Sequence, residues 1–188
     1  MNQPPSLLLI TWNRSQYLEK MLANLHADPA HFRVYWWDNA SEDERTRELF
    51  ETTNDKRIVW KHRHEENVGQ REPCLWFLEN AESDIVGKID DDILLPHGWT
   101  DRIAPMLRAE PRFGMLGCWI FMESDWDAEA AKRNTVETTA GPVLRMTGVA
   151  GQSFLMRKQH ALQYVLQEPR GHGIPIDRPQ MSLHGLIS

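Results

Sequence analysis

The chain has 188 residues, of which 41% are hydrophobic and 26% charged, as in ordinary globular domains and unlike disordered chains. A net charge of −6 argues against a general nucleic-acid-binding surface, and no apolar run approaches the roughly 18 residues of a membrane span. The N-terminus lacks the basic region and cleavage site of a signal peptide. Cys74 and Cys118 lie far apart, which excludes a cysteine-rich zinc site and a disulfide framework. We therefore expect one domain over residues 1–188 and a cytoplasmic location.

The first half alternates short apolar runs with helical patterns. The runs predict strands at residues 6–10, 34–37, 57–62 and 84–89. Four helices are predicted: one capped by Ser15, one opened by a capping box of Ser41 and Glu44, one at about 72–81, and one at about 99–107. This βαβαβαβα order predicts an α/β fold, a three-layer αβα sandwich with a mostly parallel central sheet.

The second half is less regular. Its apolar segments predict strands at residues 114–122, 142–147 and 152–156, followed by a helix at 158–167. The polar residues 123–137 are predicted to form a loop, and the Gly- and Pro-rich tail from residue 169 is predicted to be irregular.

Each of the four early strands ends in a polar cluster. The clusters are Thr11–Arg14, Asp38–Ser41, Glu66–Gly69 and Asp90–Asp92. The carboxyl ends of parallel strands lie side by side, and ligands of open α/β sheets bind in the crevice outside them. We therefore expect the clusters to converge on one pocket.

The acidic triplet Asp90–Asp92 is the most informative cluster. Carboxylates spaced i, i+2 can hold a hard divalent cation, leaving coordination positions for water and substrate phosphates. The alternative is that these acids cap a turn or the helix after Pro96 and are screened by solvent. Because the triplet follows an apolar strand and shares an edge with three other polar clusters, the metal interpretation is favoured.

These residues resemble the family 2 glycosyltransferases with the GT-A fold. "LLITWNR" is similar to the first strand and Thr-Tyr-Asn-Arg turn of that family, with Trp12 in the Tyr position. "VYWWDNASEDE" resembles the second strand and its Asp-Asn-x-Ser turn, and "ENVG" the Asn-x-Gly loop. "KIDDDILLPHGW" resembles the Asp-x-Asp segment and the Pro-x-Gly-Trp after it. The four motifs occur in the family's order and spacing.

The resemblance implies a metal-dependent, inverting transfer of a sugar from a UDP- or GDP-sugar to an acceptor hydroxyl. Residues 1–99 would then form the nucleotide-sugar-binding half and residues 100–188 the acceptor-side half. Thr11 and Asp38 would contact the base, Asp90 the ribose or a metal-bound water, and Asp92 would ligate Mn²⁺ or Mg²⁺, with Asp90 as a second candidate ligand. The remaining residues implied in nucleotide-sugar binding are Trp12, Asn13, Arg14, Asn67, Gly69, Arg71, Lys88 and Asp91. For Arg71 and Lys88 a solvated surface position is the alternative, and Asp91 has no distinct role.

An inverting enzyme of this family needs a general base for the acceptor hydroxyl. The favoured candidate is Asp177 in "GIPIDRP", which follows a segment (148–158) resembling the Gly-rich acceptor-side stretch of the family. A turn carboxylate beside Arg178 is the alternative. Weaker candidates for the base are Glu123, Asp125 and Asp127, and His172 and His184 are candidates for a C-terminal metal ligand.

Two departures from the family pattern concern the diphosphate and the acceptor. The family carries an Arg-Asn pair about seven residues after Asn-x-Gly, where this chain has Cys74 and Leu75. The chain also ends at Ser188, before the longer C-terminal elements of many members. Whether it is a compact member or part of a longer protein stays open.

Two other functions stay open on the sequence. A nucleotidyltransferase of similar architecture also uses paired carboxylates and Mg²⁺, but "TWNRSQ" lacks the glycines of its phosphate loop. The other is a nucleotide-sugar-binding module without transfer activity, which the missing Arg-Asn pair favours. Release of pyrophosphate in place of nucleoside diphosphate would indicate the nucleotidyltransferase. Donor binding without hydrolysis or transfer would indicate the binding module.

Overall fold

The computed structural model describes residues 3–118, 126–138, 141–145, 153–167 and 186–187. The elements are β1 (Ser6–Thr11), α1 (Ser15–Ala27), β2 (Arg33–Asp38), α2 (Glu44–Thr52), β3 (Ile58–Arg63), α3 (Arg71–Asn80), β4 (Ile85–Asp90), α4 (Trp99–Ala109), β5 (Met115–Cys118), α5 (Ala128–Asn134), β6 (Thr135–Thr138), β7 (Gly141–Leu144), β8 (Ser153–Arg157), α6 (Lys158–Gln167) and β9 (Leu186–Ile187). The strands and helices predicted through α4 are confirmed, with boundaries shifted by a residue or two. None of the described helices has the length and apolar character needed to cross a membrane.

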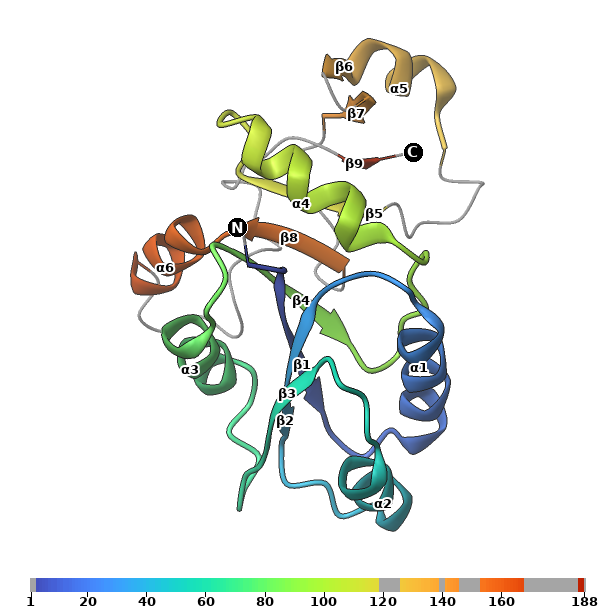
Figure 1. Cartoon of the computed structure of the whole chain (residues 1–188), viewed down its shortest axis with the longest axis vertical. Helices are drawn as coiled ribbons and strands as arrows, with labels where there is room; N and C mark the ends of the chain where they lie inside the picture. The colour runs from blue at the N-terminus through green and yellow to red at the C-terminus, as the bar shows by residue number, and fades with distance from the viewer. Residues whose placement is uncertain (1–2, 119–125, 139–140, 146–152, 168–185, 188) are drawn as a thin grey trace.

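One sheet runs through the molecule, with the described strands in the order β3-β2-β1-β4-β8-β5-β9-β7-β6 (Figure 1). The first four strands in this order are parallel, and β8 runs antiparallel to both β4 and β5. The mostly parallel central sheet that the sequence predicts is therefore confirmed. Because β1 lies between β2 and β4, the polar ends of these three strands are neighbours.

Helices cover both faces of this sheet and give it two apolar cores (Figure 1). On one face, Leu18 of α1, Phe50 of α2 and Leu107 of α4 are buried against alternate residues of the central strands. On the other face, Phe77 of α3 and Ala161 of α6 are buried against the remaining residues of the same strands. Central strands buried on both faces need continuous apolar runs, which explains the pattern of "SLLLI" and "VYWW".

The contact between β4 and β8 depends on a glycine. A Cβ atom on Gly87 would lie 2.2 Å from the carbonyl oxygen of Phe154, so no larger residue fits without displacing β8. Gly87 is three residues before the acidic triplet. The antiparallel strand therefore packs directly beside the strand that carries these carboxylates.

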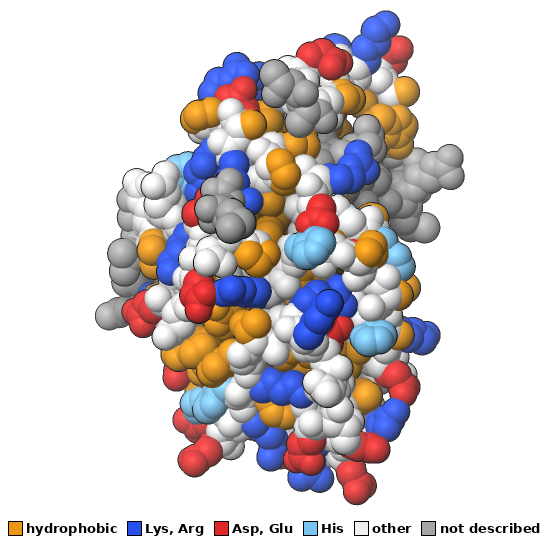
Figure 2. Space-filling model, viewed as in Figure 1, with side chains coloured by type: hydrophobic (Ala, Val, Ile, Leu, Met, Phe, Trp, Pro, Cys, Tyr) orange, Lys and Arg blue, Asp and Glu red, His pale blue; other side chains and the backbone are white. Residues whose placement is uncertain are grey.

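An aromatic cluster closes the β3 edge of the sheet. Trp60 of β3 stacks on Trp76 of α3 with 3.7 Å between ring centroids, and Trp37 of β2 stacks on His64, just after β3. Figure 2 shows hydrophobic side chains gathered on the surface over α3 and β3. Several of the tryptophans thus serve in packing.

Two predicted helix caps are wrong. The N-cap of α2 is Asp43, whose carboxylate accepts a hydrogen bond from the Thr46 backbone N–H, whereas the Ser41 hydroxyl is engaged by Asp38. The N-cap position of α1 is occupied by Arg14, with no side-chain cap hydrogen bond, and Ser15 is the first helical residue. The Ser41 side chain bonds to Asp38 at the end of β2, and the Arg14 side chain bonds to Asp92 just after β4, so neither caps its helix.

The prediction of a loop at residues 123–137 is also wrong. The described part of this stretch contains α5 and most of β6, and Asp127 caps α5 by accepting from the backbone N–H groups of Glu129 and Ala130. Its alanines and long charged side chains have high helix propensity despite their polarity. The predicted strand at 114–122 is described only as far as Cys118.

Candidate functional site

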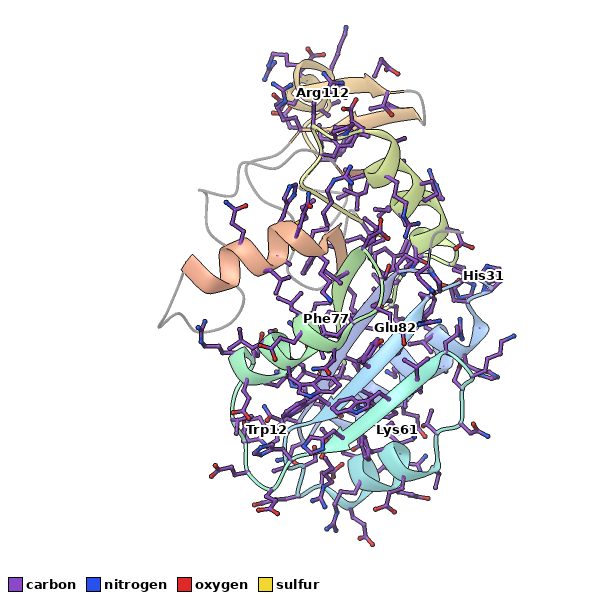
Figure 3. All side chains as sticks on the ribbon, turned by 60° about the vertical axis from the view of Figure 1, so that its left-hand side comes forward. Trp12, His31, Lys61, Phe77, Glu82 and Arg112 are labelled. Carbon is purple, nitrogen blue, oxygen red and sulfur yellow. The ribbon has the colours of Figure 1, made fainter. Side chains whose placement is uncertain are left out.

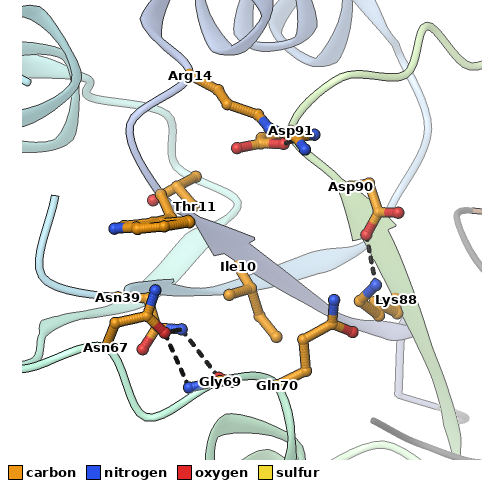
Figure 4. A pocket seen from close by; sticks show the side chains of 11 residues that line it. Ile10, Thr11, Arg14, Asn39, Asn67, Gly69, Gln70, Lys88, Asp90 and Asp91 are labelled. Carbon is orange, nitrogen blue, oxygen red and sulfur yellow. Dashed lines mark hydrogen bonds and ion pairs between the residues drawn. The ribbon is translucent and has the colours of Figure 1, made fainter. Parts of the chain in front are cut away.

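A pocket of about 390 Å³ opens at the carboxyl ends of β1, β2 and β4 (Figure 4). In Figure 3 Trp12 marks the same end of the sheet, where the arrowheads of the first strands gather. The lining residues come from all four polar clusters and from residues close to them in the sequence. They are Ile10, Thr11, Trp12, Arg14, Asn39, Asn67, Gly69, Gln70, Lys88, Asp90 and Asp91. The predicted convergence of the four clusters is therefore confirmed.

Asp38 lies beneath the pocket. Its carboxylate is fully buried and accepts hydrogen bonds from the hydroxyls of Thr11 (2.9 Å) and Ser41 (2.6 Å) and from the Ser41 backbone N–H (3.0 Å). The Arg63 guanidinium completes the set at 3.3 Å. The Thr11 hydroxyl in turn accepts from Trp36 Nε1. Both residues predicted to contact a base are thus bonded within the protein.

Asn13 ties the loop after β1 to the loop after β2. Its backbone adopts a left-handed conformation (φ 52°), and its side-chain oxygen accepts from the backbone N–H groups of Glu42 (2.7 Å) and Asp43 (2.9 Å). Its own backbone N–H donates to the Ser41 hydroxyl. Asn13 shapes the pocket without lining it.

Asn39 holds the third loop in place. Its amide donates to the side-chain oxygen of Asn67 and to the carbonyl of Gly69, both at 2.9 Å, and its oxygen accepts from the Val68 backbone N–H. Gly69 has a φ of 73°, which suits glycine. Three lining residues, Ile10, Asn39 and Gln70, were not individually predicted to bind the ligand, although each stands directly beside a residue that was.

Two cationic side chains pair with the acidic triplet, and Figure 4 shows Lys88 beside Asp90 and Arg14 beside Asp91. Lys88 Nζ lies 2.5 Å from an oxygen of Asp90, and Arg14 lies 2.6 Å from Asp92 and 3.7 Å from Asp91. The Lys88 side chain is only 10% exposed and that of Arg14 is 54% exposed. Asp92 bonds to Arg14 at the edge of the pocket and is not one of its lining residues.

Asp91 is the most buried carboxylate of the triplet. Its pKa is raised to about 6, mainly by burial and also by the negative charges of Asp92 and Asp90, while Arg14 and the Trp12 backbone N–H oppose the shift. The pocket therefore contains a carboxyl group that holds its proton up to mildly acidic pH.

The triplet fits a hard cation only in combination with a ligand. Its oxygens are the donors that Mn²⁺ and Mg²⁺ prefer. Within the described ranges, no group of three or more His, Cys, Asp or Glu side chains is arranged to hold a metal ion. Asp90 and Asp92 can therefore supply only part of a coordination sphere, which phosphate and water oxygens would complete.

Helix α3 offers no positive charge where the family pattern has its Arg-Asn pair. Cys74 is buried in the core, and burial raises the pKa of its thiol to about 12, so it stays protonated. Leu75 packs partly buried beside it. Arg71 begins α3 and is not among the residues that line the pocket.

Of the residues predicted as general base or C-terminal metal ligand, the structure describes only Asp127. Asp127 is the cap of α5, which is a structural role. The other residues predicted as base or C-terminal metal ligand lie outside the described residues and stay predictions; they are Asp177, Glu123, Asp125, His172 and His184.

Comparisons with known proteins agree with this geometry. The family model "Glycosyl transferase family 2" matches residues 6–166 of the chain. A search of curated protein sequences found no match to this chain.

Three solved structures share the fold at low sequence identity. A mannosyltransferase of Pyrobaculum calidifontis, in complex with GDP-Man and Mn²⁺, is 17% identical with a TM-score of 0.67, over 100% of this chain and 55% of its own. Residues 1–349 of S. aureus TarS with UDP-GlcNAc are 16% identical with a TM-score of 0.61, over 84% and 46%. GalNAc-T7 with UDP, GalNAc and Mn²⁺ is 14% identical with a TM-score of 0.65, over 98% and 42%. The chain thus spans about half the length of these compared chains, and the likeness establishes the GT-A fold.

Proposed function

The chain belongs to glycosyl transferase family 2, and from this premise we propose that it transfers a glycosyl group from a nucleoside-diphosphate sugar to an acceptor hydroxyl, with inversion and with Mn²⁺ or Mg²⁺ as cofactor. The observation that carries the proposal is the pocket at the ends of β1, β2 and β4. It combines an acidic triplet with two cationic side chains, Arg14 and Lys88. These are the charges needed to receive a metal and a diphosphate together.

Asp92 and Asp90 would hold the cation. When bound, the cation acts as a Lewis acid that stabilises the negative charge gathering on the leaving nucleoside diphosphate. The GDP-Man and Mn²⁺ in the mannosyltransferase structure support this cofactor class. Lys88 and Arg14 add positive charge from the pocket wall, where α3 supplies none at residues 74 and 75.

Trp12 is the residue best exposed for contact with the base. Its side chain lines the mouth of the pocket and the residue is 52% exposed, and a flat aromatic face suits stacking. Asn67 and Gly69 lie on the neighbouring loop. A contact from Asp38 to a ring N–H would require one of its present donors to give way.

The acceptor hydroxyl must lose a proton as the sugar is transferred. We retain Asp177 as the proposed base, acting from the acceptor-side half of the chain. Placed opposite the departing diphosphate, a carboxylate accepts this proton while the anomeric carbon forms its new bond.

Calorimetric titration of UDP and GDP with and without Mn²⁺ tests the proposal. We expect one of these nucleotides to bind in a Mn²⁺-dependent manner and Asp92→Asn to remove the dependence while the fold survives. Asp101→Asn, at an exposed carboxylate of α4 that bonds to His31, is the matched control. Absence of Mn²⁺-dependent binding to either nucleotide would contradict the proposal.

A binding module without transfer activity is the second candidate, because a thiol and a leucine replace the Arg-Asn pair. Product analysis with UDP- and GDP-sugars separates the two. Release of nucleoside diphosphate by water or an acceptor supports the transferase. Donor binding without any release supports the binding module. Release of pyrophosphate when the chain is instead given a nucleoside triphosphate and a sugar 1-phosphate indicates a nucleotidyltransferase.

A further inference from the structure

Arg14 bonds to the carboxylate that the proposed function assigns to the metal. Its guanidinium lies 2.6 Å from Asp92 and 3.7 Å from Asp91, and so connects the loop after β1 with the end of β4. The same side chain lines the pocket (Figure 4). Among the interactions of the described residues, Asp92 accepts a hydrogen bond from no side chain other than Arg14.

A divalent cation and a guanidinium compete for such a carboxylate. Both need its oxygens, and two positive charges held side by side repel each other. A guanidinium that loses its carboxylate is well suited to a diphosphate, because its planar fork makes paired hydrogen bonds to phosphate oxygens.

The two cations of the pocket differ in their freedom to move. The Lys88 side chain is 10% exposed and lies within the sheet on β4, whereas Arg14 is 54% exposed on the loop before α1. The long side chain of Arg14 reaches the pocket from this loop. Arg14 can therefore change partner without disturbing the core.

Resting on the proposed function, we propose that Arg14 is a positioning residue that pairs with Asp92 before metal and donor bind, and transfers to the donor diphosphate when a divalent cation takes its place on Asp92. Metal and nucleotide then assist each other. Metal binding alone must displace Arg14 with no new partner for the guanidinium, whereas metal together with a diphosphate supplies one. By linkage, the factor by which nucleotide strengthens metal binding equals the factor by which metal strengthens nucleotide binding.

Mn²⁺ binding to the full chain, followed by electron paramagnetic resonance of the free ion, tests this exchange without measuring activity. In the absence of nucleotide we expect Arg14→Gln to bind Mn²⁺ about 5- to 10-fold more tightly than wild type, because a competing ion pair and a repelling charge are both removed. With GDP or UDP present we expect the variant to lose most of the mutual strengthening. Arg14→Lys, which keeps the charge, should stay close to wild type in Mn²⁺ affinity.

Arg45→Gln is the matched control. Arg45 is an exposed arginine with two carboxylate partners, Glu19 and Glu48, on α1 and α2, and it does not line the pocket. The Arg45→Gln substitution removes one positive charge, as Arg14→Gln does, and we expect the Mn²⁺ affinity of this variant to equal that of wild type. Thermal unfolding checks that each variant folds.

The outcomes separate the exchange from the proposed function. Tighter Mn²⁺ binding by Arg14→Gln but not by Arg45→Gln supports the exchange. Equal Mn²⁺ affinities in wild type and Arg14→Gln, with nucleotide binding still dependent on Mn²⁺, overturn the exchange and leave the proposed function standing. Failure of every variant to bind Mn²⁺, with or without nucleotide, overturns both.

Discussion

The strands on either side of β1 end in carboxylates that differ in their bonding partners. Asp38, at the end of β2, is fully buried and bonds to two hydroxyls, a backbone N–H and a guanidinium that all belong to the frame of the loops. Asp90 and Asp92, at the end of β4, are partly exposed, and each has a charged side chain as its partner. Position at a strand end is therefore not enough to assign a carboxylate to a ligand.

The contrast teaches how the two groups contribute. Removing a buried carboxylate that organises several donors leaves those donors unsatisfied, and the cost falls on stability. Removing a carboxylate paired with a long, exposed cation costs little stability, because water replaces the partner. Asp38 should thus act mainly through the fold, and Asp92 mainly through ligand binding.

The largest effect on stability is expected at Asp38. Asp38→Ala leaves the hydroxyls of Thr11 and Ser41 without their acceptor and removes the ion pair with Arg63, so we expect a loss of about 3 kcal/mol in the free energy of unfolding. Urea denaturation measures it, with Asp101→Ala as the surface control. A loss as small as that of the control would remove the distinction between the two groups.

Asp55, a buried carboxylate away from the pocket, provides a reference for the effect of such a group on stability. Hydrogen bonding from Arg57 holds the pKa of Asp55 at about 2 against the opposing effect of burial. Because this pKa is below its unfolded value of 3.8, the stabilisation is fully present above about pH 4 and is lost as the pH falls toward 2. We expect Asp55→Asn to cost about 2 kcal/mol at pH 7 and much less near pH 2 by denaturant unfolding. A difference from wild type that does not change with pH would contradict this account.

A smaller effect is expected at Lys88. Lys88→Met keeps the buried stem but leaves Asp90, whose side chain is 28% exposed, to be solvated, so we expect a loss of about 1 kcal/mol. Because the pocket also loses a positive charge, the affinity for GDP or UDP with Mn²⁺ should fall about 10-fold by calorimetry. Unchanged nucleotide affinity would show that Lys88 serves the sheet alone.

The smallest effect on stability is expected at Asp92. Asp92→Asn breaks an ion pair whose two side chains are 54% and 37% exposed, so the free energy of unfolding should change by less than about 0.5 kcal/mol. The same substitution should abolish the Mn²⁺ dependence of nucleotide binding. A destabilisation as large as that of Asp38→Ala would place Asp92 with the frame of the loops.

The strands and the meeting of their ends could be predicted from the sequence because both depend on simple physical patterns. Continuous apolar runs mark strands buried on two faces, and parallel strands bring their carboxyl ends to one edge. This was enough to predict that Thr11, Asn67 and Asp90 share a pocket, which the structure confirms.

The hydrogen-bond partners at that edge could not be predicted in the same way. Whether Ser41 caps a helix or donates to Asp38 depends on the three-dimensional position of the strand end, and so does the choice of Arg14 as the partner of Asp92. The helix α5 was missed because a short polar helix has no apolar stripe to reveal it. The order of strands beyond β4 likewise depends on pairings distant in the sequence.

The pairing partners of β4 have a consequence for the order of folding. Strands β1, β2 and β3 pair through crossovers of ordinary length, but β4 must pair with β1 across roughly 70 residues and with β8 across roughly 60, at a higher entropic cost. We expect β1, β2 and β3 to assemble early and β4 and β8 to dock late. In the interval the open edge of β1 is a template for pairing with other chains. Until the strand that carries the acidic triplet covers this edge, refolding should lose yield as the protein concentration rises.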